Sequence, residues 1–279
     1  MNSTPTTLIT GASGGIGREI AGLLAARGHR LVFVSRDGDR LQQAAEALRR
    51  DHGVDVHIHP IDLSAAGAAQ RLHDHVRRAG LQVDMLVNNA GLGVVEEQHV
   101  AIDPQRLQQM LQLNVVTLAE LCHRFGAEMK HRRSGRILNI ASSAAYQPTP
   151  YLAAYGASKS FVLNFSEALA KELEDYGVSV SCLSPGPTDT AFFDAVDPRR
   201  IAGGHHFGKA KRADPRAVAQ AGVDLMLAGG LSQVVGLGHR ALVFVNRFAP
   251  RALVAAVSKR LLRPLDPPAA GEPQREGRR

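Results

Sequence analysis

Short apolar runs alternate with longer amphipathic segments over the first two thirds of the chain. Six runs of three to six residues, rich in Val, Leu and Ile, predict buried β-strands. These runs are Thr7–Thr10, Leu31–Val34, Val54–His59, Met85–Val87, Arg136–Ile140 and Val178–Leu183. Between them, apolar residues recur at helical spacing. The expected helices are Ile16–Arg27, Arg40–Arg50, Ala68–Arg78, Pro104–His131 and Tyr155–Tyr176.

This alternation predicts an α/β fold with a single doubly wound parallel sheet of about seven strands and helices on both faces. Connections between parallel strands are right-handed, so the helices cover both sides of the sheet. A ligand crevice is then expected at the carboxyl ends of the strands.

The pattern changes after Pro187. Residues 191–213 are rich in Gly, Pro and charge and predict a mobile loop around a short helix. A helix is expected again at Ala217–Ala228, and Leu242–Val245 is a candidate for a last short strand. Apolar residues at helical spacing over 250–263 predict an amphipathic helix with basic flanks.

The chain is therefore expected to form one α/β domain over residues 1–245. A basic amphipathic helix over 246–263 extends it, and a Pro/Gly/charge-rich tail over 264–279 is expected to be disordered. A length of 279 residues suits one such domain. With 44% apolar residues, 5% aromatic residues and no Trp, the core must be built from Ala, Val, Leu and Ile.

Cysteine content and the N-terminus point to a soluble cytoplasmic protein. Cys122 and Cys182 are the only cysteines and make no disulfide framework, which favours a reducing compartment. Residues 1–7 are polar and lead straight into a strand, leaving no room for a signal peptide. No apolar run approaches the roughly 18 residues of a membrane-spanning helix.

The net charge of +7 is concentrated in two segments. Residues 199–216 contain six Lys/Arg and one acidic residue, and residues 246–279 contain eight Lys/Arg and three acidic residues. No nucleic-acid-binding motif accompanies them, so no nucleic-acid partner is expected. The first interpretation is solvated surface, and the second is a site for phosphate or anionic lipid headgroups.

A glycine-rich turn, Thr10–Gly17, lies between the first strand and the first helix. Gly11 permits the tight turn, Gly15 lets the backbone approach a pyrophosphate, and Gly17 lets helix and strand pack closely. The phosphates would sit at a helix N-terminus, where N–H groups and the dipole favour anions. The turn therefore predicts a dinucleotide site, although a plain strand–helix turn would also explain its glycines.

The end of the second strand favours NADP over NAD. Ser35 occupies the tip and Arg36 follows, and an Arg there accommodates the extra phosphate of NADP. In the alternative interpretation Arg36 is solvated and Asp37 caps the next helix. Asp62, after the third strand, is expected to bind the adenine amino group or to cap a helix.

Tyr155 and Lys159 are expected on one face of a helix, four positions apart. A free phenol has a pKa of about 10, and a nearby ammonium and a cationic nicotinamide would both lower it. Tyr155 could then exchange a proton with an alcohol oxygen during hydride transfer. Taken alone, the pair is equally compatible with an ordinary amphipathic helix.

Further motifs, which follow one another in the order typical of the family, make the sequence resemble the short-chain dehydrogenase/reductase family over about residues 6–190. The motifs are Thr10-Gly11-(x3)-Gly15-Ile16-Gly17, Asn88-Asn89-Ala90-Gly91, Asn114, Ser142, Tyr155-(x3)-Lys159 and Pro185-Gly186. The resemblance implies a Rossmann-type fold and NAD(P)-dependent chemistry on an alcohol or carbonyl. The subgroup it resembles most includes ketoacyl reductases, hydroxysteroid dehydrogenases and bacterial oxidoreductases.

The resemblance implies the following catalytic roles. Ser142, or with lower expectation its neighbour Ser143, binds the substrate oxygen, and Tyr155 is the acid/base. Lys159 binds the nicotinamide ribose and tunes Tyr155, and Asn114 holds a water that links Lys159 to solvent. Asn114 alone is also explained by a local hydrogen bond within its helix.

The resemblance also implies the remaining cofactor contacts. They are Ser13, Leu63, Asn88, Asn89, Ala90, Gly91, Pro185, Gly186, Thr188 and Thr190. One position departs from the pattern of many NADP-using members, which carry a basic residue where this chain has Gly14. Arg36 must therefore supply most of the phosphate recognition, and NAD is the less expected cofactor.

The segments expected to contact substrate are apolar and predict a hydrophobic ketone, aldehyde or alcohol. Their residues are Ala144, Tyr151, Leu152, Pro187, Phe192 and Phe193. Phe192 and Phe193 are equally explained as anchors of the loop to the core. His205 and His206 have no ligand partner at suitable spacing, so no metal is expected.

The sequence therefore predicts an NADP(H)-dependent oxidoreductase, with a non-catalytic NADP(H)-binding sensor or scaffold of the same fold as the alternative. A homodimer or homotetramer built from helices 104–131 and 155–176 is expected. The helix over 246–263 is expected to pack on the sheet or on another subunit, and a membrane surface is the less favoured partner.

Overall fold

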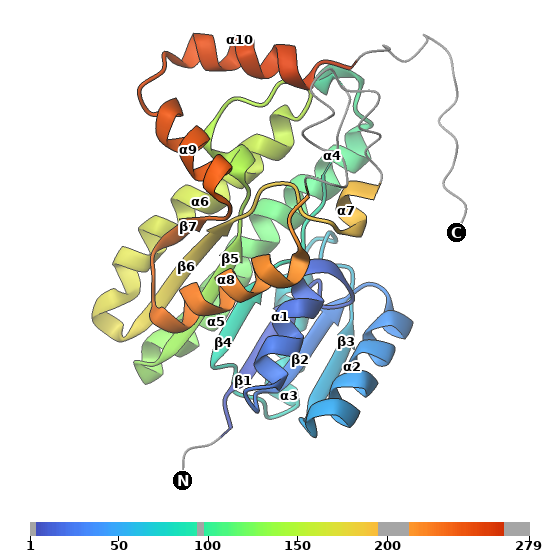
Figure 1. The fold of residues 1–279 in the computed structure, drawn as a ribbon. Coiled ribbons are helices and arrows are strands. Elements are labelled where there is room, and N and C mark those ends of the chain that lie inside the picture. The colour runs from blue at the N-terminus through green and yellow to red at the C-terminus, as the bar shows by residue number, and fades with distance from the viewer. Residues whose placement is uncertain (1–3, 94–97, 195–211, 265–279) are drawn as a thin grey trace.

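A seven-stranded parallel sheet forms the centre of the computed structural model, which describes residues 4–93, 98–194 and 212–264 (Figure 1). The strand order is β3-β2-β1-β4-β5-β6-β7. The strands are β1 Thr6–Thr10, β2 Arg30–Ser35, β3 Val56–Pro60, β4 Met85–Asn88, β5 Gly135–Ile140, β6 Val178–Ser184 and β7 Ser232–Val234. The chain winds outward from β1 to β3 and then restarts at β4 on the other side of β1. The predicted doubly wound fold is confirmed.

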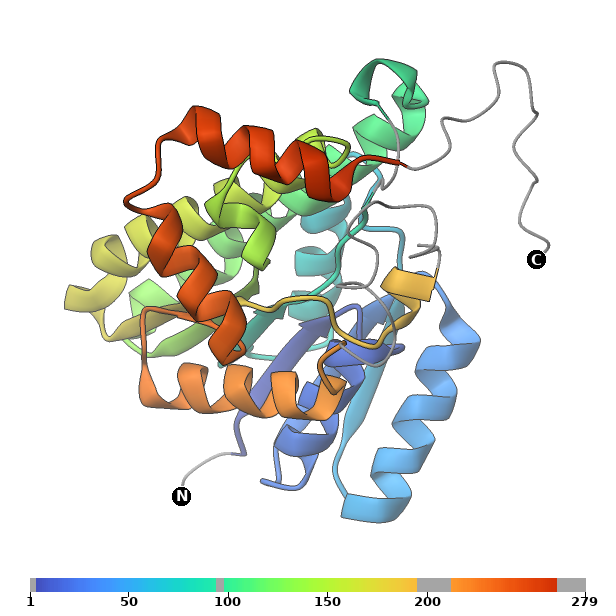
Figure 2. The same ribbon diagram turned by 45° about the horizontal axis from the view of Figure 1, so that its top comes forward.

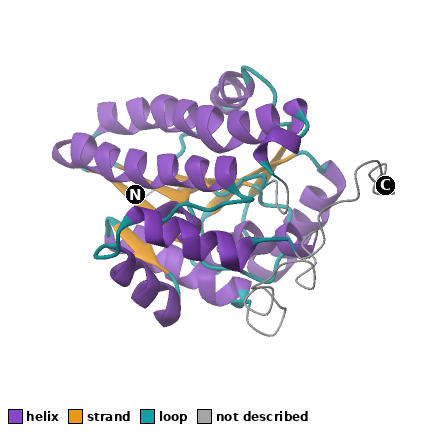
Figure 3. Ribbon diagram, turned by 90° about the horizontal axis from the view of Figure 1, so that it is seen from above, coloured by secondary structure: helices purple, strands orange, loops and turns teal. Residues whose placement is uncertain are grey.

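Helices cover both faces of the sheet, as Figure 3 shows from above. One face is covered by α1 Gly15–Ala25, α2 Gly38–His52 and α8 Pro215–Ala228, and the other by α3 Ala68–Arg78, α5 Leu118–Arg132 and α6 Ala153–Leu173. Each face has its own apolar core, made mostly of Ala, Val, Leu and Ile. Alternate strand residues enter the two cores, which is why these strands are apolar along their whole length.

The last short strand was predicted wrongly. Leu242–Val245 lies in α9, Leu237–Asn246, and the seventh strand is Ser232–Val234, which pairs with β6. A short apolar run fits either a strand or a helix. The sheet edge is already occupied by the time the chain reaches residue 242, because α8 ends at Gly229 in the left-handed conformation and leads directly into β7.

The segment expected as one long helix is interrupted by a π-helical turn. It consists of α4 Pro104–Leu111, the turn η2 Gln112–Thr117 and α5. A π turn holds an extra residue and is often found at functional sites. Here it contains Asn114, whose side chain is buried.

The C-terminal extension contains two helices rather than one. The expected helix over 250–263 is confirmed as α10, Arg251–Leu262, and α9 precedes it at one end of the molecule (Figures 1 and 2). Val254 and Ser258 of α10 are buried, so one of its faces packs on the protein. No helix in the described ranges is both long and apolar enough to cross a membrane.

Parts of three predictions lie outside the described residues. They are most of the loop predicted over 191–213, the histidines His205 and His206, and the tail after Pro264. The start of that loop is described and forms the short helix α7, Ala191–Asp194. The domain boundaries proposed from the sequence therefore stay a prediction.

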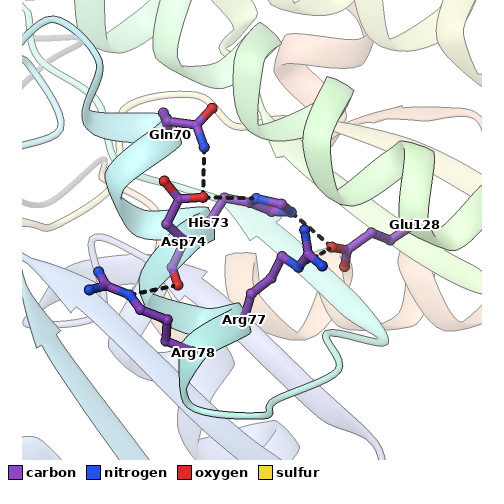
Figure 4. A network of polar contacts seen from close by, with 6 residues as sticks. All are labelled: Gln70, His73, Asp74, Arg77, Arg78 and Glu128. Carbon is purple, nitrogen blue, oxygen red and sulfur yellow. Dashed lines mark hydrogen bonds and ion pairs between the residues drawn. The ribbon is translucent and has the colours of Figure 1, made fainter.

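A polar network joins α3 to α5 on one face of the sheet (Figure 4). His73 Nε2 lies 2.9 Å from Glu128 Oε1, and Arg77 Nε lies 4.0 Å from the same oxygen. His73 also packs edge-on against the Phe125 ring, with centroids 5.1 Å apart. The network ties α3 to α5, the helix that continues directly from the π turn.

A second network, fully buried, ties β4 and β5 to α6. Asn88 Nδ2 donates to Asn139 Oδ1 at 2.9 Å, and Asn139 Nδ2 donates to Ser166 Oγ at 2.9 Å. Ser166 Oγ in turn donates to Val162 O. Both polar atoms of the central amide, Asn139, have a partner, so this chain ties the sheet to the helix that carries Tyr155.

Replacing the central amide of this network tests its contribution to stability. We expect Asn139→Ala to lower the free energy of unfolding by about 2–4 kcal/mol, because it leaves a cavity and buried polar groups without partners. Urea unfolding followed by circular dichroism measures this. The control Asn164→Ala, at an exposed position of α6, should change stability by less than about 0.5 kcal/mol. Equal effects of the two substitutions would contradict the assignment.

Candidate active site

A cleft of about 580 Å³ lies at the carboxyl ends of the strands, as the topology predicts. Except for Thr10, Gly17 and Asn88, every cofactor residue expected from the sequence lines it. The lining members of that set are Gly11, Ser13, Gly15, Ile16, Ser35, Arg36, Asp62, Leu63, Asn89, Ala90, Gly91, Tyr155, Lys159, Pro185, Gly186, Thr188 and Thr190.

Thr10 and Gly17 hold the glycine-rich turn in place on the side away from the cleft. A Cβ on Gly17 would collide with the carbonyl oxygen of Gly11, so only glycine allows α1 to start so close to β1. Thr10 Oγ1 accepts hydrogen bonds from the backbone N–H groups of Asn89 and Ala90, both at 3.0 Å. The Asn89 side chain donates to the carbonyl oxygens of Thr10 and Gly11 at 3.0 and 3.2 Å.

The turn fits a pyrophosphate. Gly15 has a φ of +53°, which favours glycine, and α1 begins without a side-chain N-cap hydrogen bond or an acidic residue in its first turn. A Cβ on Gly14 would meet no atom within 4 Å, so the space in front of the turn is open. Uncapped N–H groups at a helix start bind phosphate oxygens well.

Two arginines lie at one end of the cleft. Arg36 follows β2, and Arg40 lies one turn into α2; both are exposed and line the cleft. Asp37 caps α2 by accepting from Arg40 N at 3.0 Å, which confirms the capping alternative for Asp37. Arg40 was not expected from the sequence, although it lies only four positions after Arg36.

Asp62 closes the turn after β3. Its Oδ1 accepts from Ser64 N at 2.9 Å and from Ser64 Oγ at 2.7 Å. Burial alone would raise the pKa of this carboxyl, but the two hydrogen bonds from Ser64 and the charge of Arg36 together lower it. The alternative that Asp62 caps a helix is wrong, because the N-cap of α3 is Gly67.

Ser142, Tyr155 and Lys159 meet at the inner end of the cleft. Ser142 follows β5, and the other two lie in the first two turns of α6. The side chain of Ser142 acts on the Tyr155 hydroxyl and lowers its pKa, against the effect of burial. Lys159 is buried, and its Nζ donates to Ile140 O at 2.9 Å and lies 5.9 Å from the centre of the Tyr155 ring.

Burial sets the protonation of both residues. It raises the pKa of Tyr155 to about 12, partly offset by the side chain of Ser142. It lowers the pKa of Lys159 to about 8. The expected lowering of the Tyr155 pKa by Lys159 together with a cationic nicotinamide stays a prediction for the cofactor complex, because in the protein alone the loss of water around the phenol dominates. Tyr155 is therefore a protonated phenol at neutral pH.

Asn114 bonds across to two other segments rather than within its own helix. Its Nδ2 donates to Leu92 O at 2.8 Å and to Ser158 Oγ at 3.1 Å, and its Oδ1 accepts from Leu92 N at 2.9 Å. The alternative of a local hydrogen bond is therefore wrong. The water-holding role stays a prediction.

Asn88 does not line the cleft, contrary to expectation. It is buried and bonds to Asn139 and Cys122 behind the site. The cofactor side of this segment is formed by Asn89, Ala90 and Gly91. The side chain of the last residue of β4 enters the core, and the next residue is the first to face the crevice.

Phe192 is the one described residue of the apolar set that lines the cleft. Its ring centre lies 5.6 Å from that of Tyr155, and the ring packs against Gly93, which sequence analysis missed. Ala144, Tyr151, Leu152 and Pro187 lie in the two segments that flank this cleft but do not line it. The Phe193 side chain lies outside the described residues.

Helix α9 reaches the site from the C-terminal extension. His239 packs so closely on Gly186 that a Cβ there would overlap the imidazole. Asn246 Nδ2 donates to Gln147 Oε1 at 2.5 Å, between Ser142 and Tyr155 in the chain. Burial lowers the pKa of His239. The contact of α9 with the site was not expected from the sequence, because the local pattern of a helix does not show which distant segment it packs against.

Comparison with known proteins gives a family match over most of the chain. The model of the short chain dehydrogenase family matches residues 5–200. The chain is 35% identical to mouse 17-beta-hydroxysteroid dehydrogenase type 3 over 179 residues, which cover 64% of this chain and 58% of that protein. It is 30% identical to an uncharacterized oxidoreductase of Staphylococcus saprophyticus over 216 residues, 77% of this chain and 88% of that one.

Two solved structures have a fold similar to that of this chain. A short-chain dehydrogenase from Sphingobium yanoikuyae in complex with NADPH has a TM-score of 0.77 and 27% identity, covering 98% of this chain and all of that one. L-Sorbose reductase from Gluconobacter frateurii, complexed with NADPH and L-sorbose, has a TM-score of 0.73 and 28% identity. The match covers 84% of this chain and 95% of the reductase. With the cleft, the glycine-rich turn and the Ser142–Tyr155–Lys159 cluster in place, the chain belongs to the short-chain dehydrogenase family.

Proposed function

We propose that the protein is an NADP(H)-dependent oxidoreductase that transfers a hydride between the nicotinamide and a carbonyl or secondary alcohol of an apolar substrate. The observation that carries this is one cleft with a phosphate-binding turn and two arginines in one part, and Ser142, Tyr155 and Lys159 in the other. A sensor or scaffold would not need the second group.

Tyr155 is proposed as the proton donor in the reduction. Its phenol is protonated at neutral pH and lies beside Ser142, so it can give its proton to a carbonyl oxygen that becomes an alkoxide. Ser142 would bind the same oxygen and stabilise its developing charge. When bound, NADPH supplies the hydride to the carbonyl carbon.

Lys159 would bind the nicotinamide ribose and replenish the proton of Tyr155. Its donation to Ile140 O fixes the ammonium beside the cleft, and a pKa of about 8 lets it gain and lose a proton near neutral pH. Asn114 would hold the water that connects Lys159 to solvent, since its amide already orders Leu92 at the cleft wall.

NADP is proposed over NAD because Arg36 and Arg40 supply two guanidinium groups where the adenosine phosphate would lie. The NADPH complexes of the two related structures support this. An apolar substrate is proposed because Phe192 walls the cleft beside Tyr155. Assembly into a homodimer or homotetramer through α4–α5 and α6 stays a prediction; Val116 and Phe161 on these helices are exposed.

Removing the phenol hydroxyl tests the mechanism. We expect Tyr155→Phe to lower kcat/KM for reduction of an apolar ketone by about 10³-fold or more, because the phenylalanine ring has no proton to give to the substrate oxygen. NADPH oxidation followed by absorbance measures this. The affinity for NADPH, measured by fluorescence titration, should change by less than about threefold. A wild-type rate in Tyr155→Phe would refute the assignment, and NADPH binding without turnover of any carbonyl by the wild type would support the sensor alternative.

Cofactor preference is tested at the end of β2. We expect Arg36→Ser to raise the Kd for NADPH about 10–100-fold and to leave that for NADH nearly unchanged, because only NADPH carries the extra phosphate. Isothermal titration calorimetry measures both. The control is Arg50→Ser, at an exposed arginine that lies in the helix that follows, α2, and does not line the cleft. The same loss with both dinucleotides would contradict the role given to Arg36.

The pH dependence of reduction should report Lys159. The ammonium is present below its pKa of about 8 and is lost above it, so kcat/KM should fall as pH rises through about 8. Tyr155 remains protonated over that range because its pKa is about 12. Lys159→Arg keeps its charge, so in this variant the fall near pH 8 should disappear, whatever its absolute rate. A wild-type profile that stays flat to about pH 10 would exclude Lys159 as the titrating group.

A further inference from the structure

The two C-terminal helices leave apolar stripes exposed. Of thirteen large apolar side chains that are exposed in the described ranges, eight lie between Leu237 and Leu261. On α9, Leu237, Phe244 and Val245 fall within an arc of about 100°. These side chains are 82%, 60% and 59% exposed. Phe248, 77% exposed, packs edge-on against Phe244 and continues the stripe into the turn before α10.

The stripe on α10 is built the same way. Leu253, Val257 and Leu261 recur every four residues and are 42–56% exposed. The packing of this helix uses the neighbouring face, through Val254 and Ser258. The sequence favoured packing on the sheet or on another subunit, and packing on the protein accounts for only one face of α10. An apolar concentration of this size on a surface marks an interaction site.

The charge of these helices has a single sign. Between residues 237 and 263 the chain has six Lys/Arg and no Asp or Glu. All six are exposed, and within the described part of the chain none of them forms an ion pair. By helical spacing, Arg240 and Arg247 border the stripe of α9, and Arg260 and Arg263 border that of α10.

The exposed apolar stripes and the positive charge together decide which partner fits this surface, a second copy of the chain or an anionic lipid bilayer. A second copy docking through the same surface about a two-fold axis would bring the six cations of each copy together, and residues 237–263 contain no acidic residue to pair them. An anionic lipid bilayer offers negative headgroups to the arginines and an acyl boundary to the Phe, Leu and Val side chains. We propose that α9 and α10 form a peripheral docking surface for anionic membranes.

Docking there would bring the bilayer close to the active site. Helix α9 contacts Gly186 through His239 and Gln147 through Asn246, so the same helix joins the proposed lipid surface to the substrate side of the cleft. This consequence, and only this one, rests on the proposed function: an apolar substrate dissolved in the membrane would reach Tyr155 by a short path.

Vesicle sedimentation with the whole chain, without cofactor or substrate, tests the proposal. We expect the protein to bind vesicles of phosphatidylcholine and phosphatidylserine mixed at about seven to three, and to bind phosphatidylcholine vesicles much less. Raising the salt to about 0.5 M should release it, because the attraction to headgroups is screened. Failure to sediment with the mixed vesicles would overturn the proposal.

Matched variants locate the surface. We expect Phe248→Ser to weaken partitioning about tenfold, whereas Val100→Ser, at a residue 89% exposed in the segment before α4, should have no effect. Arg247→Gln/Arg260→Gln should also weaken it about tenfold or more. The control Arg50→Gln/Arg77→Gln removes the same charge from α2 and α3, and should have no effect. Equal losses in the test and control variants would overturn the assignment to α9 and α10.

Two further measurements separate the remaining outcomes. Size-exclusion chromatography of Phe248→Ser should show the wild-type oligomeric state. A smaller species with unchanged vesicle binding would show that the stripe contacts a second copy and would overturn the proposal. Tyr155→Phe should sediment like the wild type, so a catalytic failure of the proposed function would leave the vesicle result standing.

Discussion

Hydrogen bonds that join the ends of β1 and β4 set the geometry on which the cleft depends. The chain leaves β1 toward β2 and β3 and later returns to the other side of β1 as β4. At that reversal Thr10 Oγ1 accepts two backbone N–H groups of the segment after β4, and the Asn89 side chain donates back to the glycine-rich turn. The turn is thus fixed from the side opposite the proposed phosphates, and its free N–H groups face the crevice.

The chemistry of the inner end of the cleft follows from the exclusion of water. Burial raises the pKa of Tyr155 and lowers that of Lys159, so both groups favour their neutral forms more than they would in water. A protonated phenol suits donation to a ketone oxygen. Lys159 keeps its charge at neutral pH with the help of Ile140 O, which accepts one of its N–H groups. The Asn88–Asn139–Ser166 chain holds the strand before Ser142 and the helix of Tyr155 at a fixed separation.

The C-terminal helices α9 and α10 have one side beside the active site and another side exposed to solvent. Their inner contacts reach Gly186 and Gln147 beside the active site, while their outer faces carry exposed Phe, Leu and Val side chains bordered by arginines. The absence of acidic residues across this surface distinguishes it from α5 and α6, where the proposed subunit contacts lie and both signs of charge occur. The lipid surface proposed for α9 and α10 is therefore separate from the surface proposed for contact with a second copy.

Local spacing, and backbone conformations that few residues adopt, were enough to predict the fold class, six of the seven strands, the glycine-rich turn and the Tyr155–Lys159 pair. Packing between distant segments was needed to show that Leu242–Val245 is helical, because Ser232–Val234 already forms the strand beside β6. It also placed Arg40 in the cleft, turned Asn88 into the core and packed His239 on Gly186. The direction of the Tyr155 pKa shift depends on how much water surrounds the phenol, which is a property of packing between distant segments and has no signature in local sequence.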